Sequence, residues 1–148
     1  MVSTRPVALL LRPKGKVSHM AMDDASNTIA WVEGAKTVRV GRLENDAMIE
    51  VNTTFSTHHR VSYLGFHREG LVVGDDLDSL MFYDLEGNIV EKQAIDGGVQ
   101  TCHTMGLKVV VLSGMGEVVL AQLGRASLNL SKQLELDDVV HLAVHGQR

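Results

Sequence analysis

Three residues of the chain, His19, Cys102 and His141, have side chains of the types that bind zinc in proteins. All three fall in short apolar segments that we expect to form β-strands. Packed β-sheets lie ~10 Å apart and zinc holds its ligands within ~2.3 Å, so strands of different sheets share a metal only at a common axis. The spacing therefore favours packing roles for these residues, and we expect neither a metal nor another cofactor.

Two polar segments carry further candidates. The segment Asp75-Asp-Leu-Asp78 is similar to the start of a calcium-binding loop, but it lacks the glycine and the distal glutamate that such a loop requires. We interpret it as a charged turn between two strands. The segment Thr57-His-His-Arg60 contains tandem histidines and an arginine, and we interpret it as a solvated loop.

Motifs of catalysis and nucleotide binding are missing from the sequence, among them Gly-x-Ser-x-Gly, the P-loop, Cys-x-x-Cys and His-Glu-x-x-His. The glycines of Ser113-Gly-Met-Gly116 join two predicted strands and open no helix, so they form no dinucleotide signature. We therefore predict that the chain is not an enzyme. The alternative is a metal-binding or enzymatic ring that uses His19, Cys102 and His141.

Composition limits the partners of the chain. Its 148 residues include 45% hydrophobic and 22% charged residues, as expected for one globular domain over residues 1–148. The net charge of −4 and the lack of a Lys/Arg cluster in the sequence argue against nucleic acid, and no apolar run approaches the ~20 residues of a membrane span. The single cysteine favours a reducing compartment, and we expect a cytoplasmic protein.

A repeat supplies the elements that position these residues. Similar strand openings begin at Val17, Val61, Gln100 and Val139, and we align Met20, Leu64, His103 and Leu142, which are 44, 39 and 39 residues apart, as core positions between blades. A period of about 40 residues with four short strands is typical of propeller arrays. The sequence predicts an all-β array of four-stranded antiparallel blades at about 16–53, 60–95 and 99–134, with partial strands at 6–13 and 139–146.

One segment of the second repeat, Ser79-Leu-Met-Phe-Tyr-Asp-Leu-Glu-Gly-Asn-Ile-Val90, resembles the third-to-fourth-strand passage of WD40 β-propellers. Tyr83-Asp84 stands in place of the Trp-Asp pair. The first repeat has Gly41-Arg42 at this point and the third has Ala121-Gln122, and the Gly-His pair that often opens a WD40 repeat is missing. The resemblance covers about residues 16 to 146 and implies degenerate WD40-like blades that act as an interaction scaffold.

Propeller topology predicts that the connections leading into each inner strand and those joining each second and third strand emerge on one face. We call this the loop face, and we expect it at residues 14–16, 33–36, 58–60, 75–79, 96–98, 114–117 and 137–138. Rigidly mounted loops concentrate binding residues. The loop face carries charged residues of both signs with an acidic bias, and such a surface suits a protein or peptide partner. The predicted partner-binding residues are Lys36, His58, His59, Arg60, Asp75, Asp76, Asp78 and Glu117.

Closed propellers have typically 4–8 blades, and the sequence predicts three. An open array exposes apolar blade faces, here with Met20, Met22, Leu142 and Val144. Two explanations stay open: the chain is a fragment of a longer propeller, or it is a homo-oligomer in which its own copies complete the ring. A further alternative is a structural subunit of a larger assembly that uses the apolar ends.

Overall fold

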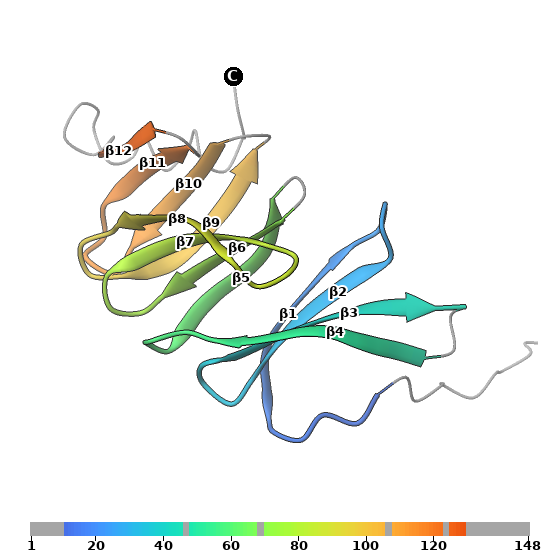
Figure 1. Cartoon of the computed structure of the whole chain (residues 1–148). Coiled ribbons are helices and arrows are strands. Elements are labelled where there is room, and N and C mark those ends of the chain that lie inside the picture. The colour runs from blue at the N-terminus through green and yellow to red at the C-terminus, as the bar shows by residue number, and fades with distance from the viewer. Residues whose placement is uncertain (1–10, 46–47, 68–69, 106–107, 123–124, 130–148) are drawn as a thin grey trace, which may run out of the picture.

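The computed structural model describes residues 11–45, 48–67, 70–105, 108–122 and 125–129. These residues form twelve β-strands in three four-stranded antiparallel sheets, each with its strands in chain order (Figure 1). Blade 1 contains β1 (Val17–Asp23), β2 (Thr28–Glu33), β3 (Thr37–Glu44) and β4 (Met48–Ser56). Blade 2 contains β5 (Val61–His67), β6 (Gly70–Asp75), β7 (Ser79–Asp84) and β8 (Ile89–Ala94). Blade 3 contains β9 (Val99–Met105), β10 (Lys108–Ser113), β11 (Val118–Gln122) and β12 (Arg125–Asn129).

The predicted all-β class and the four-stranded antiparallel blades are confirmed. Of the two predicted terminal strands, residues 139–146 and 6–10 lie outside the described residues, and residues 11–13 lie in no strand. No helix in the described ranges is long and apolar enough to cross a bilayer.

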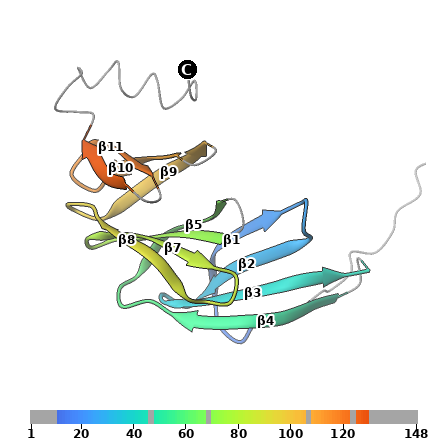
Figure 2. The ribbon, with the colours of Figure 1, turned by 45° about the horizontal axis from the view of Figure 1, so that its top comes forward.

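The three blades are stacked in chain order, with the first strand of each blade against the first strand of the next (Figures 1 and 2). An apolar cluster fills the space between blades 1 and 2, and its members include Val32, Val38, Leu64 and Val73. A second cluster lies between blades 2 and 3. Its buried members are Val72, Leu80, Phe82, Ile95, Val99, Cys102, Val109, Val111, Val119 and Ala121. Blade stacking therefore provides both of these cores.

The Tyr83-Asp84 pair has a local structural role. The Asp84 carboxylate accepts hydrogen bonds from the backbone N–H groups of Glu86 and Asn88, at 3.0 and 2.8 Å, and from the Asn88 side chain at 3.1 Å. The bond from the Asn88 N–H is the main reason why the pKa of Asp84 is below its ordinary value. The ring of Tyr83 stacks on Phe55 of blade 1 with centroids 4.3 Å apart. This pair therefore closes the β7–β8 turn and joins blade 2 to blade 1.

Strand register corrects one alignment made from the sequence. Val17, Val61 and Val99 pair with Glu33, Asp75 and Ser113, the last residue of each second strand. A register irregularity follows at the same place in each blade.

Counted from these valines, the residue equivalent to Met20 and Leu64 is Cys102, and the alignment on His103 is wrong. A shift of one residue moves a side chain to the opposite face of its sheet. Cys102 is accordingly buried between blades 2 and 3, with 5% of its surface exposed, whereas His103 is exposed on the far face of blade 3.

Candidate functional site: the loop face

The loop face assembles as its topology predicts, because backbone hydrogen bonds connect the turns. Within blade 1, the N–H of Thr57 donates to the carbonyl of Lys36, and across blades 1 and 2 the N–H of Val61 donates to that of Ala35, both at 2.9 Å. In blades 2 and 3, the N–H groups of Asp76, Ile95 and Gly114 bond to carbonyls of neighbouring turns on the same face. Residues 137–138, also predicted on this face, lie outside the described residues.

The buried side chain of Asp75 stabilises the β6–β7 turn. Its carboxylate oxygen Oδ1 accepts hydrogen bonds from the backbone N–H groups of Leu77, Asp78 and Ser79 at 3.1, 2.8 and 2.9 Å. The residue is 2% exposed. Three N–H groups that would otherwise lack an acceptor in this tight turn are therefore satisfied by one side chain.

The other two blades use different acceptors at the equivalent position. In blade 3, the Ser113 hydroxyl accepts hydrogen bonds from the N–H groups of Met115 and Glu117, at 3.2 and 3.1 Å. In blade 1, the equivalent residue is Glu33, which takes part in a side-chain network instead. The same point of each blade thus carries a polar residue that fixes the local geometry near the loop face.

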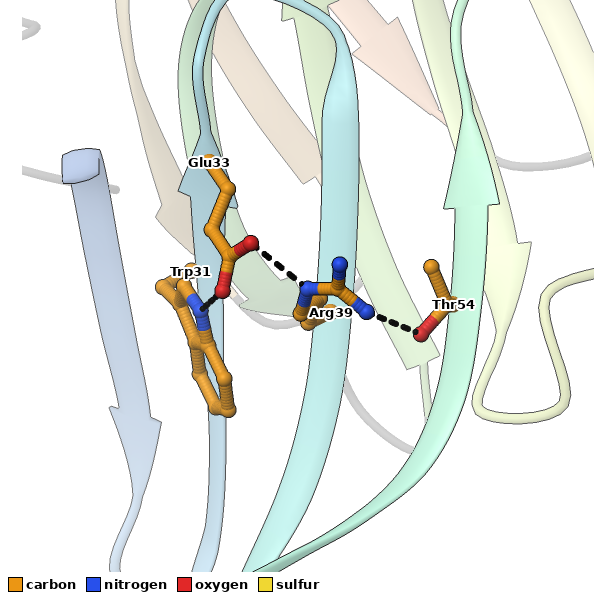
Figure 3. A network of polar contacts seen from close by, with 4 residues as sticks. All are labelled: Trp31, Glu33, Arg39 and Thr54. Atoms are coloured by element: carbon orange, nitrogen blue, oxygen red, sulfur yellow. Dashed lines mark hydrogen bonds and ion pairs between the residues drawn. The ribbon is translucent and has the colours of Figure 1, made fainter. Parts of the chain in front are cut away.

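The network around Glu33 links three strands of blade 1 (Figure 3). The indole Nε1 of Trp31 donates a hydrogen bond to Glu33 Oε1 at 3.0 Å, and Arg39 Nε lies 2.8 Å from Glu33 Oε2. Arg39 also donates to the Thr54 hydroxyl at 3.1 Å. Burial raises the pKa of Glu33, but the hydrogen bonds from Trp31, Arg39 and the Lys14 backbone and the charge of Arg39 together outweigh burial, and the net pKa lies below its ordinary value.

This network was missed in the sequence. The signal for it is the spacing of Trp31 and Glu33, because residues two apart on a strand share one face. Both lie on the face of blade 1 opposite to Ala30 and Val32, which pack toward blade 2.

The predicted partner-binding residues differ in exposure. Lys36, His58, Arg60, Asp76 and Asp78 are exposed on the loop face, whereas His59 and Glu117 are half-buried. Asp75 is buried and its Oδ1 is engaged with the backbone, so its contribution to this face is to hold the turn. The binding of a partner by these residues stays a prediction.

Charge on the loop face is segregated by blade, unlike the mixture expected from the sequence. Cations gather on the blade 1 side: Lys14, Lys16, Lys36 and Arg60 are all exposed there, joined by His58. The turns of blades 2 and 3 at 75–79, 95–98 and 113–117 contain no lysine or arginine. Their charged residues are Asp75, Asp76, Asp78, Asp96 and Glu117.

Of the residues considered as zinc ligands, His19 and Cys102 do not meet. Cys102 faces blade 2 from blade 3, whereas His19 pairs with Val32 on the side of blade 1 that faces blade 2, and His141 lies outside the described residues. Blade 2 therefore separates the first two. In the part of the chain that the structure describes, no group of three or more His, Cys, Asp or Glu side chains is gathered as a metal ion would require.

Cys102 has a different neighbour, which the sequence did not reveal. The Tyr63 hydroxyl donates a hydrogen bond to its sulfur. Burial raises the pKa of Cys102 to about 12, and the Tyr63 bond offsets only part of this effect. The residue is therefore a protonated thiol at neutral pH, unlike the thiolate of a reactive cysteine.

Known proteins resemble this chain in structure only. No protein-family model matches it, and no curated protein matches its sequence. A chain of the S. cerevisiae complex of Dbp5 with Nup159, Gle1, IP6 and ADP aligns with a TM-score of 0.61 and 15% identity over 80% of this chain. Atg21, solved with the coiled coil of Atg16, gives 0.62 and 14% over 79%, and K. marxianus Hsv2 gives 0.58 and 17% over 76%.

The similarity to Atg21 and Hsv2 identifies the fold type, because both are WD40 propeller proteins. The chain has the fold of an unclosed propeller. It spans 34%, 41% and 37% of the lengths of the three natural chains. The computationally designed protein Ika4 is also similar, with a TM-score of 0.52 and 11% identity, and the match covers 82% of this chain and the whole of Ika4.

Proposed function

We propose that the chain is a non-catalytic propeller-type scaffold that binds a protein partner through its loop face. The observation that carries the proposal is the backbone-bonded set of turns that holds exposed Lys36, Arg60, Asp76 and Asp78 on one surface. Turns whose backbone is already fixed lose little backbone freedom when they bind, which lowers the cost of binding. The structure of Atg21 with the coiled coil of Atg16 supports the proposal, because a propeller of similar fold is there in complex with a protein.

A capture experiment tests the use of this face. The bait is the full chain, and its loop-face variant combines Lys36→Ala, Arg60→Ala, Asp76→Ala and Asp78→Ala, which changes no net charge. The matched control combines Arg42→Ala, Lys92→Ala, Glu50→Ala and Asp24→Ala, which are exposed residues away from the loop face. Quantitative mass spectrometry then compares the proteins retained by the wild type and by each variant.

The expected result is a partner that the wild type and the control retain and that the loop-face variant loses. Removal of one exposed charge affects stability by about 0.5 kcal/mol or less, so four such changes cost about 2 kcal/mol at most and both variants should remain folded, which circular dichroism checks. Equal retention by the loop-face variant and the control contradicts the proposal.

A second function, self-association that extends the array, is favoured by exposed methionines of β1 on the face of blade 1 that points away from blade 2. Met20 and Met22 are 64% and 49% exposed on this face. In blade 2 the equivalent positions are Leu64 and Phe66, which pack into the cluster against blade 1. The test is the molar mass in solution by size-exclusion chromatography with light scattering. A discrete oligomer supports self-association, and a monomer at high concentration rejects it.

A further inference from the structure

The cations of the loop face form a compact corner that the sequence did not show. They come from three separate segments, 14–16, 36 and 58–60. The N–H of Gly34 donates to the carbonyl of Lys16 at 2.7 Å, and the N–H of Thr57 donates to that of Lys36 at 2.9 Å. The Thr57 hydroxyl also donates to the carbonyl of His59 at 2.7 Å. These bonds fix the three segments beside one another. We call Lys14, Lys16, Lys36, His58 and Arg60 the basic corner.

The charges of the basic corner are not neutralised within the described chain. Two buried acids lie close to the corner, and both are engaged elsewhere. Glu33 is engaged by Trp31 and Arg39 and by the backbone N–H of Lys14, and Asp75 Oδ1 accepts hydrogen bonds from three backbone N–H groups of its own turn. None of the four lysine and arginine side chains has a carboxylate within ion-pair distance among the described residues. The corner therefore presents concentrated positive charge on a protein whose net charge is −4.

The surface next to this corner determines which anion fits. The N–H of Asp76 donates to the carbonyl of Arg60 at 3.0 Å, so the acidic turns of blades 2 and 3 begin directly beside the basic corner. Two apolar side chains project among these turns, Leu77 at 52% and Met115 at 67% exposure. An extended polyanion such as duplex DNA or an anionic membrane would place negative charge over both areas. Asp76 and Asp78 would repel it.

A peptide segment of limited length avoids this repulsion. Resting on the proposed function of the loop face, we propose that the partner contributes an acidic segment that lies over the basic corner and continues with an apolar residue onto Leu77 and Met115. Charge complementarity orients the segment, and the apolar contact adds affinity because Leu77 and Met115 leave water. Methionine suits such a contact, since its flexible side chain adapts to different apolar groups.

Fluorescence anisotropy with defined probes tests this proposal on the full chain. The first probe is an oligoglutamate peptide that ends in leucine, the second is oligoglutamate alone, and the third is an oligolysine peptide that ends in leucine. The variants are Lys36→Glu with Arg60→Glu, and separately Leu77→Ser. The matched control is Lys92→Glu with Arg42→Glu, which makes the same change of charge at exposed positions of β8 and β3.

We expect the first probe to bind the wild type and the control alike, and the Lys36→Glu/Arg60→Glu variant about tenfold more weakly, with affinity falling as salt increases. Leu77→Ser should weaken the first probe about fivefold and leave the second unchanged. Equal binding by the charge-reversed variant and the control overturns the proposal, as does equal binding of the oligolysine probe.

Three further outcomes decide between a polyanion surface, the acidic segment and the proposed function. Tighter binding to phosphatidylserine vesicles or to duplex DNA than to the first probe overturns the acidic segment and identifies a polyanion surface. A partner that is captured through the loop face, combined with no peptide binding, rejects the inference and leaves the proposed function standing. If instead the peptide binds but the capture experiment shows no dependence on the loop face, the proposed function fails.

Discussion

Asp75 is the residue on which the β6–β7 turn depends. Replacement by alanine removes the acceptor of three backbone N–H groups, of which that of Ser79 is buried and those of Leu77 and Asp78 are partly buried. We expect Asp75→Ala to lower the free energy of unfolding by about 1–3 kcal/mol, the cost of leaving buried polar groups without partners. Urea denaturation followed by circular dichroism measures it.

Two controls isolate this effect. Asp75→Asn keeps an acceptor oxygen at the same place and should cost less than Asp75→Ala, and Asp76→Ala changes an exposed neighbour and should cost about 0.5 kcal/mol or less. If Asp75→Ala costs no more than Asp76→Ala, the turn does not depend on this carboxylate.

Because of Cys102, the stability of the protein should vary with pH in the alkaline range. Its pKa is raised by burial to about 12 in the folded state from an ordinary value of 9.0. The contribution of the neutral thiol is fully present below pH 9, and it falls as the pH rises from 9 toward 12, because the unfolded chain releases this proton first. The free energy of unfolding should decrease by up to about 1.4 kcal/mol per pH unit in this range.

Urea denaturation at pH 8 and pH 10.5 checks this prediction, with Cys102→Ala as the comparison. The variant lacks the thiol, so its loss of stability between the two pH values should be smaller than that of the wild type. Tyr63 also has a raised pKa, mainly through burial, and accounts for part of the loss that remains. An equal loss in both proteins would show that Cys102 is not the titrating group.

At the scale of elements, Gly98 in the β8–β9 connection allows two blades to approach each other. It has a φ of +79°, and a Cβ at this position would lie 2.4 Å from the backbone carbon of Asp76. We expect Gly98→Ala to destabilise the fold by several kcal/mol, because two backbones would have to separate. Thermal unfolding detects the change.

Gly116 in the β10–β11 turn offers a matched control. Its φ is +81°, but nothing lies within 4 Å of its added Cβ. Gly116→Ala should therefore cost only the ~1 kcal/mol of the backbone conformation. Equal effects of the two substitutions would mean that the close approach of Gly98 to Asp76 does not matter for stability.

The strands of this fold are predictable from sequence because their signals are local. Runs such as Val109–Ser113 are rich in β-branched residues and end in turn residues, and the structure has β10 there. Register is less predictable, as β9 demonstrates. Its residues Val99–Met105 alternate only weakly between polar and apolar types. The alignment from sequence is therefore one residue off and assigns to His103 the position that Cys102 occupies in the structure.

The candidate site was predictable to a similar degree. The strand order of a propeller determines which connections lie on the same face, so the loop face could be predicted from the sequence alone. The sequence does not predict that Asp75 is buried and Asp76 exposed. Adjacent aspartates in a turn look alike in sequence, and only the structure shows which one accepts hydrogen bonds from the backbone N–H groups. The basic corner also needed the structure, because Lys16, Lys36 and Arg60 are 20 and 24 residues apart in sequence.

For the whole molecule, equivalent positions of blades 1 and 2 should differ in their contribution to stability, because no neighbouring blade packs on Met20 among the described residues. Leu64 is 6% exposed and Met20 is 64% exposed. Leu64→Ala should cost about 2–5 kcal/mol because it leaves a cavity between blades, whereas Met20→Ala should cost about 0.5 kcal/mol or less in dilute solution. Denaturation of both variants at low and high protein concentration measures this. A large cost for Met20→Ala at low concentration would show that the Met20 side chain is buried in solution.

The network of Figure 3 also gives the molecule a built-in optical reporter. Trp31 is the single tryptophan of the chain, and its indole is held by Glu33 in blade 1. Its emission therefore senses that blade, whereas circular dichroism averages over all strands. If the two signals change together during denaturation, the stacked blades unfold as one cooperative unit. If tryptophan emission changes first, the array loses its blades one after another, starting at the end that carries Met20.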